Sequence, residues 1–285
     1  MGEVRNLDKQ CWICEACGLQ SAPTSNTPLE CHICVDNRQF IPRGGQKWAK
    51  QELLKRQGCR NMYQKHEPGL YGIATVPKFA IGQRAFLVQT PNGNLLVDCI
   101  SFLDEATIDI INGLGGIRAI AISHPHFYAS NGQWSAAFGN IPVYIHEKDK
   151  QWAGWDHENV KYWSGESLHL WDDLTLVHLG GHFAGASVAY WASGADGKGV
   201  IISGDILQVG ADRKCVSIMR SFPNLIPLAP SHAQRIAAIL ENLKYDRVYG
   251  AFFDLEIDTD AKQIVRDSLL RYVRYLHADD LDALN

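Results

Sequence analysis

The chain has 285 residues, 46% of them hydrophobic, so it can fill a substantial core and is neither a disordered nor a fibrous sequence. Its 27 basic and 31 acidic side chains give a net charge of -4 at pH 7, and this near balance predicts no nucleic-acid partner and no membrane-seeking surface. We find no apolar signal-peptide core and no apolar run of membrane-spanning length, which predicts a cytoplasmic protein.

Cysteines are concentrated near the N-terminus, where five of the eight lie within the first 34 residues. In a reducing compartment such clustering favours metal ligation over disulfide bonds. Cys14 and Cys17 form one C-x-x-C pair and Cys31 and Cys34 form another, in a stretch (11–42) that is short of aliphatic residues. Two such pairs can place four thiolates around one zinc ion, whose binding then supplies the folding free energy.

The first pair has an alternative register, because Cys11 lies three residues before Cys14. Gly18 favours the chosen register, since a small residue directly after the pair lets backbone amides turn toward the sulfurs. The two pairs resemble a zinc-ribbon or rubredoxin-like module over about residues 10–42. Rubredoxins hold iron and usually have glycine after the second pair as well, whereas this chain has Val35. Zinc is therefore favoured, with iron as the alternative.

A Gly-Gly linker at 43–46 and a short charged helix at 47–56 follow the module. We therefore expect two domains, the module with its linker at 1–45 and a larger domain at 46–285.

The larger domain begins with strand-like segments and ends with helices. Strands are expected at 70–76, 85–90, 94–99, 117–123, 143–146, 174–179, 187–191 and 199–203, with a hairpin turn at 91–93. Ser231 is expected to cap a helix that buries Ile236, Leu240 and Leu243, and a last helix, beginning at 258–260, should bury Ile264, Leu269, Tyr272 and Leu276. This order of elements predicts an α/β fold.

Three polar motifs each follow a predicted strand. His124 and His126 lie two residues apart after the strand at 117–123, His182 follows the strand at 174–179, and Asp205 follows the strand at 199–203. The backbone of a loop at a strand end is not held to the regular geometry of the strand. The side chains of two histidines that lie two residues apart in such a loop can therefore both turn toward one ion. A single histidine there is weak evidence, and the joint pattern is what predicts a metal site.

Together these motifs resemble the metallo-β-lactamase superfamily over about residues 65–275, which implies an αββα sandwich. The resemblance implies that His124, His126 and His182 bind the first metal ion and that Asp205 matches the residue that bridges two metal sites. Asp98 matches an early strand-end aspartate that supports the metal loop.

The chain also departs from the family pattern. Tyr128 and Ala129 stand where the family has the aspartate and histidine that hold a second metal ion. No histidine appears at 248–254, where the last one is expected, although Asp254 is a possible late ligand. We therefore predict a degenerate second site and one zinc ion in addition to that of the ribbon.

This pattern predicts a one-metal hydrolase that uses zinc-activated water on a small-molecule ester, thioester or lactone-like bond. Asp205 is expected to complete the metal shell or orient the water, and Tyr128 to donate a hydrogen bond to the developing oxyanion.

Two other classes of function remain open from the sequence. One is a catalytically inactive binding protein, with the ribbon docking on a protein partner or on another copy of the chain. The other is an iron redox protein, because the superfamily includes di-iron oxygen reductases that work with rubredoxin modules. The redox interpretation needs a second metal site, which the motifs do not supply.

Overall fold

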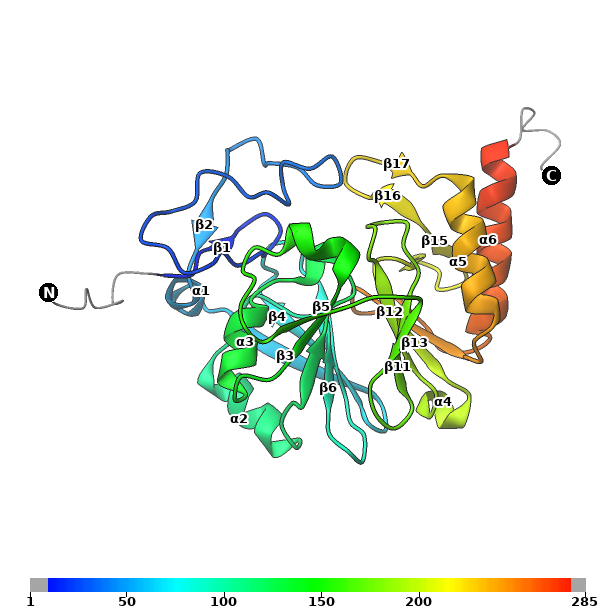
Figure 1. The fold of residues 1–285 in the computed structure, drawn as a ribbon, viewed down its shortest axis with the longest axis horizontal. Coiled ribbons are helices and arrows are strands. Elements are labelled where there is room, and N and C mark those ends of the chain that lie inside the picture. Colours follow the sequence, from blue (N-terminus) through cyan, green and yellow to red (C-terminus); the bar gives the residue numbers. More distant parts are fainter. Residues whose placement is uncertain (1–9, 278–285) are drawn as a thin grey trace, which may run out of the picture.

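Two mixed β-sheets form the centre of the computed structural model, which describes residues 10–277 (Figure 1). The first sheet has seven strands in sequential order, and its first four strands pair antiparallel while the later pairs are parallel. They are β3 (Arg60–Glu67), β4 (Leu70–Val76), β5 (Arg84–Val88), β6 (Leu95–Val97), β7 (Ala119–Ala121), β8 (Val143–His146) and β9 (Val160–Trp163).

The second sheet has six strands in the order β10-β11-β12-β13-β18-β19, and only β13 and β18 pair parallel. Their bounds are β10 (Ser167–His169), β11 (Leu174–His178), β12 (Ser187–Trp191), β13 (Val200–Gly204), β18 (Arg247–Gly250) and β19 (Glu256–Ile257). Short pairs lie outside the two sheets, namely β14 (Gln208–Val209) with β15 (Val216–Ser217) and β16 (Met219–Ser221) with β17 (Ile226–Pro227).

Helices cover the outer face of each sheet. In Figure 1, α2 (Glu105–Gly113) and α3 (Asn131–Ala137) flank the first sheet, and α5 (Pro230–Glu241) and α6 (Ala261–His277) flank the second. The remaining helical segments are α1 (Gln51–Arg56), the turn α4 (Gly194–Gly197) and the 3-10 segments η2 (Pro125–Phe127) and η3 (Glu147–Trp152). The predicted αββα sandwich is confirmed. None of the described helices is long and apolar enough to cross a membrane.

The core divides into layers that match this architecture. Side chains such as Phe86 and Ile202 fill the space between the sheets, and Ile236 with Leu269 packs under α5 and α6. The buried positions of α5 follow a helical period, and the helix begins with Pro230, whose missing N–H is unpaired at a first helical position anyway. The inward face of α6 differs from the prediction, since Leu276 is 41% exposed.

The ribbon shares its core with the sandwich. β1 (Ile13–Cys14) pairs with β2 (Trp48–Ala49), so a strand beyond the expected boundary at residue 46 closes the ribbon. Leu19 and Ile33 belong to the same buried cluster as residues of the first sheet. The boundary therefore does not separate two independent cores, and the first nine residues of the predicted module lie outside the described part of the chain.

Candidate metal centres

The four predicted ribbon cysteines converge on one point. Sγ of Cys14 lies 3.6 Å from Sγ of Cys34, and the same distance separates Cys17 from Cys31. All four sulfurs lie within 4.8 Å of one another and are buried. A tetrahedron of sulfurs around zinc has edges of about 3.8 Å, so the geometry fits an ion and excludes disulfides.

The surroundings of these thiolates also suit a metal ion. Gln46 donates a hydrogen bond from its amide to Sγ of Cys14, over 3.1 Å. The backbone N–H of Gly18 turns back to the carbonyl of Cys14 within the first knuckle, with Gly18 at a φ of 86° that favours glycine. Cys11 lies outside the cluster, so the structure uses the register that begins at Cys14.

The second group comprises His124, His126, His182 and Asp205, which the structure brings together from three loops at one end of the sandwich. His124 and His126 follow β7, His182 follows β11, and Asp205 directly follows β13. Each side chain offers a ligand atom, and these atoms all lie within 4.8 Å of one another. The four residues are at most 9% exposed, so they form a buried site.

These residues fit a bound metal ion better than a closed hydrogen-bond network. Nε2 of His124 lies 2.8 Å from Oδ1 of Asp205, yet neither atom has a partner in hydrogen-bond geometry. Nε2 of His182 lies 3.2 Å from Nδ1 of His126, close to the nitrogen spacing of about 3.3 Å around zinc. Buried polar atoms that face one another without pairing are what an ion would satisfy.

Neighbouring groups hold the ligands in orientation. Nδ1 of His182 bonds to the carbonyl of Met219 at 2.8 Å, which leaves Nε2 free to face the site. Asp98 accepts a hydrogen bond from the N–H of Ser123 at 2.7 Å, and Oγ of Ser123 lies 3.0 Å from Nδ1 of His124. Asp98 therefore supports the first metal loop through Ser123.

Burial and charge set the protonation states of the group. Burial lowers the pKa of His124 and His126 below the usual range and lowers that of His182 to about 4. Burial by itself favours protonated Asp205, but His124 and His182 outweigh it and hold the pKa of this carboxyl well below its usual range. Neutral imidazoles and an ionised carboxylate are the states that metal binding requires.

Two other predicted or possible site residues, Tyr128 and Asp254, do not join the group. The hydroxyl of Tyr128 donates to the carbonyl of Asp149 at 2.9 Å, and the residue is 1% exposed, so the phenol is part of the core and does not face the cavity. Ala129 is buried and offers no side-chain ligand. Asp254 is exposed and lies outside both groups of converging ligands.

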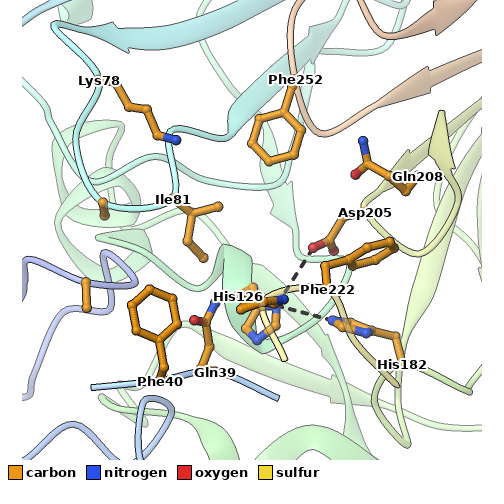
Figure 2. Close-up of a pocket in the computed structure, with 13 residues that line it drawn as sticks. Gln39, Phe40, Lys78, Ile81, His126, His182, Asp205, Gln208, Phe222 and Phe252 are labelled. Atoms are coloured by element: carbon orange, nitrogen blue, oxygen red, sulfur yellow. Dashed lines mark hydrogen bonds and ion pairs between the residues drawn. The ribbon is translucent and has the colours of Figure 1, made fainter. Parts of the chain in front are cut away.

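Three members of the histidine and aspartate group, His126, His182 and Asp205, line a cavity of about 410 Å³ (Figure 2). Most of its walls are apolar, from Ala16, Phe40, Ala80, Ile81, Phe222, Pro223 and Phe252. Gln39, Lys78 and Gln208 add polar groups, beside His126, His182 and Asp205. Ala16, Gln39 and Phe40 belong to the ribbon, so the ribbon forms one wall of the cavity.

Sequence reasoning missed most of this wall. Its residues come from separate loops and lack a motif, so only the fold brings them together. The sequence contained one signal for this wall, since Phe252 lies in the segment where the family resemblance places the last histidine. An apolar ring there, in place of a ligand, lines the cavity next to the metal site.

Several known proteins are similar to this chain in sequence or in fold. The chain is 45% identical over 269 residues to the uncharacterized protein YmaE of Bacillus subtilis (strain 168), covering 94% of this chain and 97% of that protein. The crystal structure of the metallo-β-lactamase FIM-1 from Pseudomonas aeruginosa, in its mono-zinc form, matches with a TM-score of 0.54 at 13% identity, over 75% of this chain and 96% of that one.

A metallo-β-lactamase from Erythrobacter litoralis matches similarly, with a TM-score of 0.52 at 16% identity, over 73% of this chain and 95% of that chain. At these identities the two structures show a shared fold alone. The family model of the metallo-beta-lactamase superfamily matches residues 80–251, which include all four residues of the histidine and aspartate site. The chain therefore belongs to the metallo-β-lactamase superfamily.

Proposed function

We propose that this protein is a metal-dependent hydrolase that uses a single zinc ion on an ester, thioester or lactone-like bond of a small molecule. The observation that carries the proposal is the convergence of three histidines and Asp205, of which His126, His182 and Asp205 line a cavity with mostly apolar walls. A concave, mostly apolar site with a few convergent polar groups is typical of a site for a small molecule.

A single ion is proposed because the residues at the second-site positions are engaged elsewhere. Tyr128 is bonded to the backbone of η3, and Ala129 has no donor atom in its side chain. Across residues 10–277, the only other group of converging ligands is the ribbon's cysteines. The ribbon ion, also proposed as zinc, therefore has a site separate from the reaction.

His124, His126 and His182 would hold the zinc ion, which would supply Lewis acidity and lower the pKa of a water molecule to about 7. Asp205 has a 12% exposed side chain and lines the cavity, so its carboxylate can orient the attacking water and accept its proton. The amides of Gln39 and Gln208 also line the cavity and can donate to the carbonyl oxygen of a substrate, the task first assigned to Tyr128.

Metal content tests the proposed stoichiometry. We expect elemental mass spectrometry to find about two zinc ions per full-length chain, and about one in the His124→Ala, His126→Ala double variant. His169→Ala is the matched control, because His169 is exposed on β10 and belongs to neither group of converging ligands. Equal zinc content in the wild type and the double variant, with both folded, would reject the site.

Hydrolysis tests the proposed reaction. The zinc-loaded wild type should hydrolyse nitrophenyl esters and acyl thioesters, and His182→Ala should lose this activity while keeping the circular dichroism spectrum of the wild type. Zinc-loaded protein that turns over no ester, thioester or lactone would exclude the hydrolase and leave the non-catalytic binding protein as the better account. Iron in place of zinc in the purified chain, with its visible absorbance, would instead support the redox alternative.

A further inference from the structure

The ribbon contacts both sides of the cavity. On one side, the N–H of Gln20 donates to the carbonyl of Ala129 at 3.0 Å, and Nε2 of His32 lies 2.9 Å from the carbonyl of Trp152. On the other side, the ribbon meets the β16–β17 hairpin, which Figure 1 shows beside it at the top of the view. The ribbon thus spans the mouth from one half of the sandwich to the other.

Three successive ribbon carbonyls fix the segment that enters the cavity. Asn224 donates from its amide to the carbonyls of Asn37 and Gln39, at 2.9 and 3.0 Å. Oγ of Ser221 donates to the carbonyl of Arg38 at 3.1 Å. Backbone held at three consecutive residues places the next side chain, Phe40, in a defined position at the cavity wall.

Phe40 has the exposure expected of a ligand contact and not of a core residue. Its side chain is 49% exposed and belongs to none of the buried clusters of the described chain. Figure 2 shows the ring beside Ile81, on the cavity side of the ribbon. A half-exposed aromatic ring in an apolar concavity gains further burial when a ligand fills the space.

We infer that the ribbon is a substrate-binding wall in which Phe40 contacts the acyl group and sets a preference for longer apolar acyl chains. The preference among esters rests on the proposed hydrolase function. The contact between Phe40 and an apolar chain does not depend on hydrolysis. The apolar side chains that line the cavity are numerous enough to surround an acyl chain of several carbons, and the one lysine of the lining, Lys78, suits a ligand that also carries an anionic group.

The kinetic experiment compares the acetyl and octanoyl esters of p-nitrophenol. In Phe40→Ala, the ratio of kcat/KM for the octanoyl ester to that for the acetyl ester should fall about tenfold, because the variant removes apolar contact with the longer chain. Leu29→Ala is the control, since Leu29 is a ribbon residue that is 97% exposed and does not line the cavity, and its ratio should equal that of the wild type. An unchanged ratio in Phe40→Ala would overturn the inference.

A binding experiment separates this inference from the proposed function. Isothermal titration of the zinc-loaded full chain with octanoate, an apolar carboxylate, should give a Kd that is about tenfold weaker in Phe40→Ala and unchanged in Leu29→Ala. If no protein hydrolyses either ester and the difference in Kd persists, the hydrolase is rejected and the wall is supported. Equal Kd values in the wild type and Phe40→Ala would reject the wall, whatever the hydrolysis shows.

Discussion

Asp149 is a buried carboxyl group that connects η3 to the loop carrying His182. Its Oδ1 accepts a hydrogen bond from the N–H of Gly185 at 2.7 Å, whereas Oδ2 has no partner. The residue is 1% exposed. Burial raises the pKa of this carboxyl from 3.8 to about 7, against the opposing effects of the Gly185 hydrogen bond and of the Arg38 charge. Asp149→Asn keeps the acceptor for Gly185 and removes the charge.

This raised pKa makes Asp149 a source of instability as pH rises. Between the unfolded pKa of 3.8 and the folded pKa of about 7, the folded chain holds a proton that the unfolded chain has lost. Stability contributed by the protonated carboxyl is therefore present at low pH and lost as pH rises through about 7. The full shift corresponds to about 4 kcal/mol, of which about 2.5 kcal/mol is lost between pH 5 and pH 8.

We expect the free energy of unfolding of Asp149→Asn, relative to the wild type, to rise by about 2.5 kcal/mol from pH 5 to pH 8. A fixed cost of the unpaired amide, about 1–3 kcal/mol, enters equally at both pH values and does not affect this difference. Urea unfolding at constant zinc concentration measures it. Asp109→Asn, exposed on α2, is the control and should show no such rise. The same offset for Asp149→Asn at both pH values would refute the assignment.

Three further predictions concern the core, the first metal loop and the ribbon. Glu256→Ala should lower the free energy of unfolding, measured in urea, by about 3–5 kcal/mol, because it leaves Arg84 as an unpaired buried charge. Replacement of the exposed Lys198, which pairs with Asp246, is the control and should cost less than about 1 kcal/mol. Gly204→Ala should lower the free energy of unfolding by about 1–3 kcal/mol and reduce the amount of bound zinc. The reason is that φ at this residue is +55° and a Cβ would lie 2.9 Å from Oγ of Ser123. Unchanged zinc content would contradict this prediction. Cys17→Ala should lose one zinc ion by elemental analysis and melt at lower temperature, whereas Cys11→Ala should match the wild type in both.

Hydrophobic patterns located most of the buried strands, but they missed the buried β18 and the partly exposed β3. β4 and β12 have the bounds that their apolar residues predict, because each is buried on both faces or nearly so. β3 (Arg60–Glu67) is an edge strand rich in polar residues with partly exposed side chains, and it gave no comparable signal. Its pairing with β4 over most of its length stabilises it, and such pairing is not visible in a local pattern.

The candidate metal ligands could be predicted because they lie in short sequence motifs. The residues that line the cavity could not be predicted. His124 and His126 are two residues apart, and the spacing of the cysteine pairs restricts them in the same way. The cavity instead joins Phe40, Ile81 and Phe252, which are far apart in sequence and are ordinary apolar residues. Their proximity depends on how the ribbon packs across the sandwich, which no local pattern encodes.

The altered metal motif and the added ribbon are connected in the structure. Family resemblance places second-site ligands at positions 128 and 129, which this chain uses for packing. Tyr128 bonds to the backbone of η3, and the carbonyl of Ala129 accepts the N–H of Gln20 from the ribbon. A second metal ion would need polar side chains at the same loop where the ribbon now docks, in a buried position. Positions 128 and 129 therefore serve the packing of the core and the docking of the ribbon, and because Ala129 is 1% exposed, Ala129→His would have to displace neighbouring groups at this contact.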